Sequence, residues 1–118
     1  MKQIPNVLIV YRRPLERQAN PEKIVLDSRN LQAVPLLEGE EAIKVLVLAN
    51  NSIRKIDHLV SLPNLQVLDF SSNKLAEINC FWSPSNNLAG LRQLSLGNNQ
   101  IRNIKNLENI TNLEILDL

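Results

Sequence analysis

Leucine and isoleucine recur along this chain in one pattern that repeats through most of its length. Three stretches share the order apolar-x-apolar-x-x-Asn-x-apolar, and they begin at Leu46, Leu68 and Leu94. A degenerate copy begins at Ile24, with Arg29 in place of the asparagine, and a partial copy begins at Leu116. Successive copies are 22 residues apart, except for a step of 26 between Leu68 and Leu94. Self-similarity at a fixed period of this length predicts a solenoid of stacked units.

Within each unit the apolar residues follow two different periods. The alternation of Leu46 with Leu48, and of its equivalents, is typical of a short strand with one buried face. The segment that follows has an apolar residue at every third position: Ile53, Ile56, Leu59, Leu62, Leu65 and Leu68. A strict period of three favours 3₁₀-like turns, because residues i and i+3 eclipse there; amphipathic α-helices with this spacing are the alternative. In the first unit Glu40 occupies a position where this series calls for an apolar residue.

These periods predict an α/β solenoid with a concave parallel β-sheet and a convex side of 3₁₀ and irregular segments. It would contain about four repeats plus a partial fifth, over residues 21–118. One unit cannot bury its own leucine face, so the units are expected to stack and bury it between them.

The asparagines in the repeated motif are expected to be structural. A short amide that points inward after each strand can supply donors and an acceptor to neighbouring turns. Asn51, Asn73 and Asn99 are therefore predicted to form a buried ladder. Arg29 at the same position of the first copy indicates an atypical terminal repeat.

Both ends of the chain differ from the repeats. Residues 1–20 contain an apolar stretch, Val7–Tyr11, that is expected to pair beside the first repeat strand and cover the sheet edge; the alternative is a loosely attached tail. The sequence stops at Leu118 within a strand and without a polar cap. We therefore expect either a fragment of a longer protein or self-association through this C-terminal strand edge.

Composition excludes several kinds of function. The net charge is +1, which disfavours nucleic-acid binding, and no apolar run is long enough for a membrane span. With one cysteine (Cys80) and one histidine (His58), neither a disulfide nor a His/Cys metal cluster is expected, and no phosphate-binding loop occurs. Asp27, Asp69 and Asp117 are interpreted as surface residues. The prediction is no catalysis, no cofactor and no metal, in a reducing cytoplasmic compartment.

The remaining candidate is a protein-binding surface on the concave face. Strand residues that flank the buried leucines should point outward there, and the predicted contact residues are Val25, Val45, Val47, Asn50, Val67, Asp69, Ser71, Gln93, Ser95 and Asn98. The four valines form an apolar patch, which either binds a partner or is covered by another part of the chain. Trp82, in the insertion at Asn79–Asn87, is a possible loop contact or a cover for the longer loop. Asn50 is expected to be free for recognition.

The repeated motif resembles the leucine-rich repeat, L-x-x-L-x-L-x-x-N-x-L, over residues 21–118. The 22-residue unit is similar to the intracellular subclass typified by the protein phosphatase-1 regulatory leucine-rich-repeat protein. A Pro-x-x-x-Gly-Glu element at Pro35–Glu40 and a Lys-Asn-Leu-Glu-Asn element at Lys105–Asn109 are also similar to the leucine-rich-repeat subunit of the tubulin polyglutamylase complex. These resemblances imply a non-catalytic adaptor in the cytoplasm, at the cytoskeleton, cilium or centrosome, with tubulin-associated or ciliary partners. The alternative that they imply is a regulatory subunit of an enzyme such as a protein phosphatase.

Overall fold

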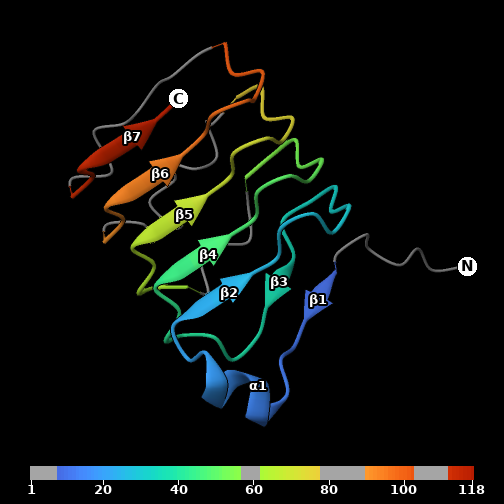
Figure 1. Ribbon diagram of the computed structural model, residues 1–118, viewed down its shortest axis with the longest axis vertical. Helices are drawn as coiled ribbons and strands as arrows, with labels where there is room; N and C mark the ends of the chain where they lie inside the picture. Colours follow the sequence, from blue (N-terminus) through green and yellow to red (C-terminus); the bar gives the residue numbers. More distant parts are fainter. Residues whose placement is uncertain (1–7, 57–61, 78–89, 103–111) are drawn as a thin grey trace, which may run out of the picture.

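A five-stranded parallel sheet forms one side of the molecule (Figure 1). The computed structural model describes residues 8–56, 62–77, 90–102 and 112–118. The strands are β2 (Lys23–Val25), β4 (Val45–Val47), β5 (Val67–Asp69), β6 (Gln93–Ser95) and β7 (Ile115–Asp117), in the spatial order β2-β4-β5-β6-β7. Consecutive repeats are therefore direct neighbours, as stacked coils require.

The strand register matches the alignment of the repeats. Ile24 lies opposite Leu46, Leu46 opposite Leu68, Leu68 opposite Leu94, and Leu94 opposite Leu116. The unit with four extra residues keeps the same strand register. The predicted parallel solenoid is confirmed.

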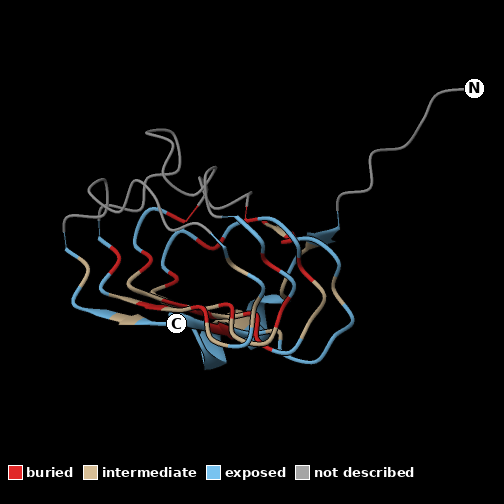
Figure 2. Cartoon of the chain, turned by 90° about the horizontal axis from the view of Figure 1, so that it is seen from above, coloured by how far each residue is buried: buried red, intermediate tan, exposed pale blue. Residues whose placement is uncertain are grey.

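The core lies inside the coils, between the sheet and the return segments. The central strand residues Ile24, Leu46, Leu68 and Leu94 are buried, while their neighbours along each strand are exposed or half-buried. The three-residue series is buried too, as shown by Ile53, Ile56, Leu62, Leu65 and Leu75. Figure 2 shows buried stretches both along the sheet and in the return segments, with exposed stretches between them.

The return segments contain little regular structure. Within the described ranges they consist of turns, bends and one short strand, β3 (Leu36–Leu37), while the single helix, α1 (Pro14–Ala19), lies in the N-terminal segment. Among the described residues of these segments, buried side chains recur every three residues without an α-helix, a spacing that tight, irregular turns allow.

The N-terminal segment packs differently from the prediction. Strand β1 (Ile9–Val10) pairs in parallel with β3, in a second sheet of two strands, and among the described strands β2 pairs with β4 alone. The expected pairing of Val7–Tyr11 beside the first repeat strand is therefore wrong. The physical reason lies in two anchors: Val10 packs against the core, and Arg12 binds the buried Glu40 of the first return segment. These contacts hold β1 beside β3 and leave the outer edge of β2 unpaired.

Candidate functional site

The sheet register sorts the predicted contact residues into two rows on the outer face of the sheet, the face that the sequence predicts to be concave. One row contains Lys23, Val45, Val67, Gln93 and Ile115, and the other contains Val25, Val47, Asp69, Ser95 and Asp117. Adjacent strands are about 4.8 Å apart, so neighbours within a row are in side-chain contact range. We call these two rows the outer sheet face.

The first three strands bring four valines together on this face. Val45 lies opposite Val67, Val25 lies opposite Val47, and both pairs share strand β4. Val25 is 43% exposed, and the other three are half-buried. The cluster is an apolar patch at one end of the outer sheet face, which we call the valine patch.

The other end of the outer sheet face is polar and acidic. Along the row that begins with Val25, the residues change to Asp69, Ser95 and Asp117. Asp69 has a fixed orientation, because its Oδ1 accepts hydrogen bonds from the backbone N–H of Ser71 at 2.9 Å and from its hydroxyl at 2.7 Å. The described residues place no donor on Asp69 Oδ2, so this oxygen is available to a basic group of a partner.

Asn51, Asn73 and Asn99 connect successive coils through their side-chain amides. Asn73 Oδ1 accepts from the backbone N–H of Ile53 at 3.0 Å, and its Nδ2 donates to the carbonyl oxygen of Leu48 at 2.9 Å, both in the preceding coil. Asn99 Oδ1 accepts from Leu75 N–H at 3.0 Å in the same way. Asn51 accepts from the backbone N–H groups of both Arg29 and Leu31.

The three amides differ in burial. Asn73 is 7% exposed, whereas Asn51 and Asn99, at the two ends of the series, are half-buried rather than buried as expected. The reason is that full coverage needs an asparagine-bearing coil on both sides. Arg29 replaces the asparagine before Asn51, and its side chain is exposed.

The residue before each of these positions has a backbone role that the sequence reasoning missed. Ser28, Asn50, Ser72 and Asn98 have φ values of 53°, 57°, 56° and 56°. This left-handed conformation is uncommon for residues with a side chain, and asparagine tolerates it better than most. Asn50 and Asn98 are exposed, as a contact residue should be, but their residue type also has this structural cause. The signal was visible as Asn or Ser at the same place in every repeat.

An ion pair at the N-terminal end was also missed. Glu40 is 2% exposed, and its two carboxylate oxygens accept from Arg12 Nε at 2.7 Å and Arg12 Nη2 at 2.8 Å. Arg17 Nε lies 3.5 Å from Glu40 Oε1, within ion-pair distance but without hydrogen-bonding geometry. We call these three residues the cap ion cluster. The signal was the carboxylate at an apolar position of the three-residue series, which requires a cationic partner when it is buried.

The carboxylate of Glu40 stabilises the charged form of the Arg12 guanidinium. The hydrogen bonds that Arg12 donates to Glu40 raise the pKa of Arg12 above its ordinary value, against the lowering effect of burial. Because this pKa is raised on folding, the stabilisation of the fold by the Arg12–Glu40 ion pair is fully present below the ordinary arginine pKa. It is lost only in strongly alkaline solution. Arg12 therefore remains charged throughout the neutral range.

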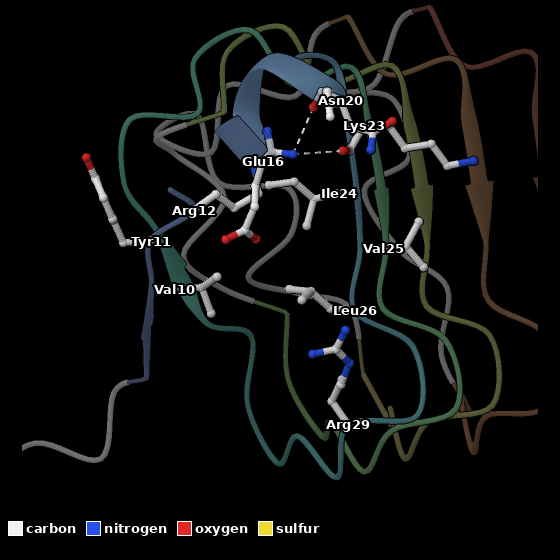
Figure 3. A pocket seen from close by; sticks show the side chains of 11 residues that line it. Val10, Tyr11, Arg12, Glu16, Asn20, Lys23, Ile24, Val25, Leu26 and Arg29 are labelled. Carbon is white, nitrogen blue, oxygen red and sulfur yellow. Dashed lines mark hydrogen bonds between the residues drawn. The ribbon is translucent and has the colours of Figure 1, made fainter. Parts of the chain in front are cut away.

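A groove of about 630 Å³ opens beside the unpaired edge of β2 (Figure 3). Val10, Ile24 and Leu26 line its apolar part, Glu16 of α1 borders one end, and Arg29 borders the other. Arg12 Nη1 closes the end near α1 by donating to the carbonyl oxygens of Asn20 at 2.8 Å and Lys23 at 3.3 Å. The described residues leave the rest of the β2 edge open.

Metal-ligating side chains are not clustered in the described part of the chain. Within the described ranges, no group of three or more His, Cys, Asp or Glu side chains is placed to hold a metal ion. His58, Cys80 and Trp82 lie outside the described residues, so the predicted loop contact at Trp82 stays a prediction. No helix in the described part of the chain is long and apolar enough to cross a membrane.

Comparison with known proteins supports the interpretation of the repeats. Residues 41–87 match a family model described as leucine rich repeats in two copies. This segment contains β4 and β5, the two strands on which most of the valine patch lies. A search of curated proteins gave no match. Leucine-rich repeat domains generally mediate protein–protein interaction and are generally non-catalytic. The family match and the strand register together support the leucine-rich repeat family, and the fold is a parallel-sheet solenoid consistent with such repeats.

Proposed function

We propose that this chain is a non-catalytic binding module that holds a protein partner on its outer sheet face. The observation that carries the proposal is the valine patch: Val25, Val45, Val47 and Val67 are brought side by side by the register of three strands. Side chains on a solvated sheet face are usually polar, and a contiguous apolar patch usually marks a contact.

The acidic end of the face suggests the chemistry of the partner. A segment that lies across the strands would meet the valines first and then Asp69, Ser95 and Asp117. Apolar side chains followed by lysine or arginine would complement both ends. The partner surface in this proposal is therefore apolar and basic, and Asp69 is already oriented by Ser71 for such a contact.

The experiment is a charge introduction in the valine patch. The double variant Val47→Asp and Val67→Asp should abolish capture of the partner, because it places carboxylates in the apolar contact. Ser95→Asp, on the same face but outside the patch, is the matched control and should retain capture. If the double variant keeps its circular dichroism spectrum and still binds every partner of the wild type, the proposal is wrong.

The same capture experiment distinguishes two classes of partner. Tubulin or ciliary proteins in the bound fraction would favour a cytoskeletal adaptor in the cytoplasm, whereas phosphatase activity would favour a regulatory subunit of an enzyme. Part of the narrower similarity to a tubulin polyglutamylase subunit has a cause in packing. Its Gly39-Glu40 element occurs where Gly39 has a φ of 71° and Glu40 binds Arg12. Since packing accounts for this element, the element does not identify the partner. The pull-down experiment is what identifies it.

Self-association through the C-terminal strand is a separate proposal. Ile115 and Leu118 on and after β7 are 53% and 61% exposed. Light scattering over a range of concentrations tests it, and a species that is monomeric at every concentration would exclude it.

A further inference from the structure

We propose that the open edge of β2 is a second binding site, which takes an extended peptide as an added strand with an acidic side chain at Arg29. This site is distinct from the valine patch, because it uses the backbone edge of the first strand and the groove between β1, α1 and β2. The juxtaposition that carries it has three parts: free backbone groups, an apolar floor and a free cation.

The backbone groups of β2 alternate between the sheet and the groove. Leu26 N–H donates to Val47 O at 2.8 Å, and Ser28 N–H donates to Ala49 O at 3.1 Å, so the even-numbered residues face β4. In a parallel sheet the N–H and C=O of the residue between them point to the opposite side. Val25 therefore directs one donor and one acceptor into the groove, where the described residues supply no partner. An edge of this kind is a template for another strand.

The floor of the groove would accept the side chains of that strand. Val10 and Leu26 are half-buried and lie on opposite sides of the groove, with Ile24 between the levels of Leu26 and α1 (Figure 3). Because side chains alternate along a strand, every second residue of an added peptide would point toward these three apolar residues. β-branched or aliphatic residues fit this environment.

Arg29 supplies the charge preference. In the other coils the equivalent asparagine reaches back to the preceding turn, as Asn51 Nδ2 does to the carbonyl oxygen of Leu26 at 3.0 Å. The turn that contains Arg29 has no repeat coil before it, and its guanidinium points along the groove toward Leu26 (Figure 3). The described residues give this guanidinium no hydrogen bond or ion pair. A carboxylate can accept two parallel hydrogen bonds from the N–H groups of this guanidinium. The proposed peptide therefore carries glutamate or aspartate at the end beside Arg29.

The test is selection of heptapeptides from a random library displayed on phage, with the whole chain as bait. The expected peptides combine alternating aliphatic residues with an acidic residue at one end. Affinity of a selected synthetic peptide should fall about tenfold or more in Arg29→Glu, because an attraction becomes a repulsion. N-methylation of its central amides should also remove binding, and the amide of Val25 should exchange more slowly with solvent in the complex.

Two controls separate this site from the outer sheet face and from misfolding. Val67→Asp, which disrupts the valine patch, should leave the affinity of the peptide unchanged. Arg29→Gln should weaken binding with an unaltered fold, since Asn51 uses only the backbone N–H of Arg29. The proposal is overturned if no peptide is selected, if Arg29→Glu binds as well as the wild type, or if protection appears on the outer sheet face instead. Occupation of the groove by a second copy of the chain, seen as dimerisation that Arg29→Glu abolishes, would overturn it as well.

Discussion

The middle of the solenoid and its N-terminal end satisfy buried polar groups in two different ways. In the middle, the neutral amide of Asn73 connects its own turn to the preceding coil, with partners in both. At the N-terminal end there is no preceding coil of the same kind, and the buried carboxylate of Glu40 is instead paired with Arg12, 28 residues away. The comparison teaches that a repeating solution works only where the repeat continues, while an end needs a specific partner.

The ion pair and the amide should differ most in the free energy of unfolding that is lost when one hydrogen-bonding partner is removed. Arg12→Ala leaves Glu40 buried with Arg17 Nε at 3.5 Å as its remaining cation. We expect a loss of about 3–5 kcal/mol in the free energy of unfolding, because an uncompensated buried charge is more costly than a lost hydrogen bond. Urea denaturation measures it. The matched control is Arg13→Ala, at an exposed position of the same segment, with an expected change within about 0.5 kcal/mol.

Replacing both charged groups tests whether the unpaired charge of Glu40 causes this loss of stability. Arg12→Met combined with Glu40→Leu puts an apolar residue where the three-residue series calls for one, and it should recover most of the stability lost in Arg12→Ala. A double variant as unstable as Arg12→Ala would mean that the hydrogen bonds of Arg12 to Asn20 and Lys23, rather than the ion pair, hold the N-terminal segment.

Removing an amide should have a smaller effect that follows burial. Asn73→Ala leaves the backbone N–H of Ile53 and the carbonyl oxygens of Leu48, Phe70 and Ser71 without this partner, and should lower the free energy of unfolding by about 2–3 kcal/mol. Asn51→Ala and Asn99→Ala should lower it by about 1–3 kcal/mol, toward the lower end, since water reaches these half-buried sites. Equal losses at all three positions in denaturant titrations would contradict the dependence on burial.

A backbone constraint at the N-terminal end should rank third. Gly39 has a φ of 71°, and a Cβ built there would lie 3.2 Å from Arg17 Nη2. Gly39→Ala should lower the free energy of unfolding by about 1–2 kcal/mol through left-handed strain and displacement of Arg17. Gly90→Ala is the control, because its φ is not in the left-handed region and its nearest contact is 3.6 Å away. Equal thermal midpoints for the two variants would argue against this strain.

The smallest effect is expected at the repeated left-handed position. Asn50→Val should lower the free energy of unfolding by about 1 kcal/mol, because a β-branched residue is strained at a φ of 57°, whereas Asn50→Gly should be nearly neutral. A loss that is the same for both variants in thermal denaturation would indicate that the asparagine side chain itself, and not its backbone conformation, contributes at this position.

Strand positions, register and most of the core could be predicted because they depend on periodicity. The 22-residue step places Ile24, Leu46 and Leu68 side by side, and the structure has this register. The extra residues before Leu94 do not disturb it, since the apolar pattern resumes in phase. The two rows of the outer sheet face follow from the same register, so the valine patch was visible in the sequence once the copies were aligned.

What the sequence could not supply were the contacts that occur once. The position of β1 beside β3, the pairing of Arg12 with Glu40, and the open edge of β2 each depend on how a non-repeating segment packs against the first coil. Glu40 could be recognised in the sequence as a misfit in an apolar series, but several arginines were equally available as its partner. A local pattern repeated many times determined the solenoid by itself, because each copy reports the same environment. Only the tertiary structure decided the N-terminal end, because a single long-range contact has no second copy in the sequence to reveal it.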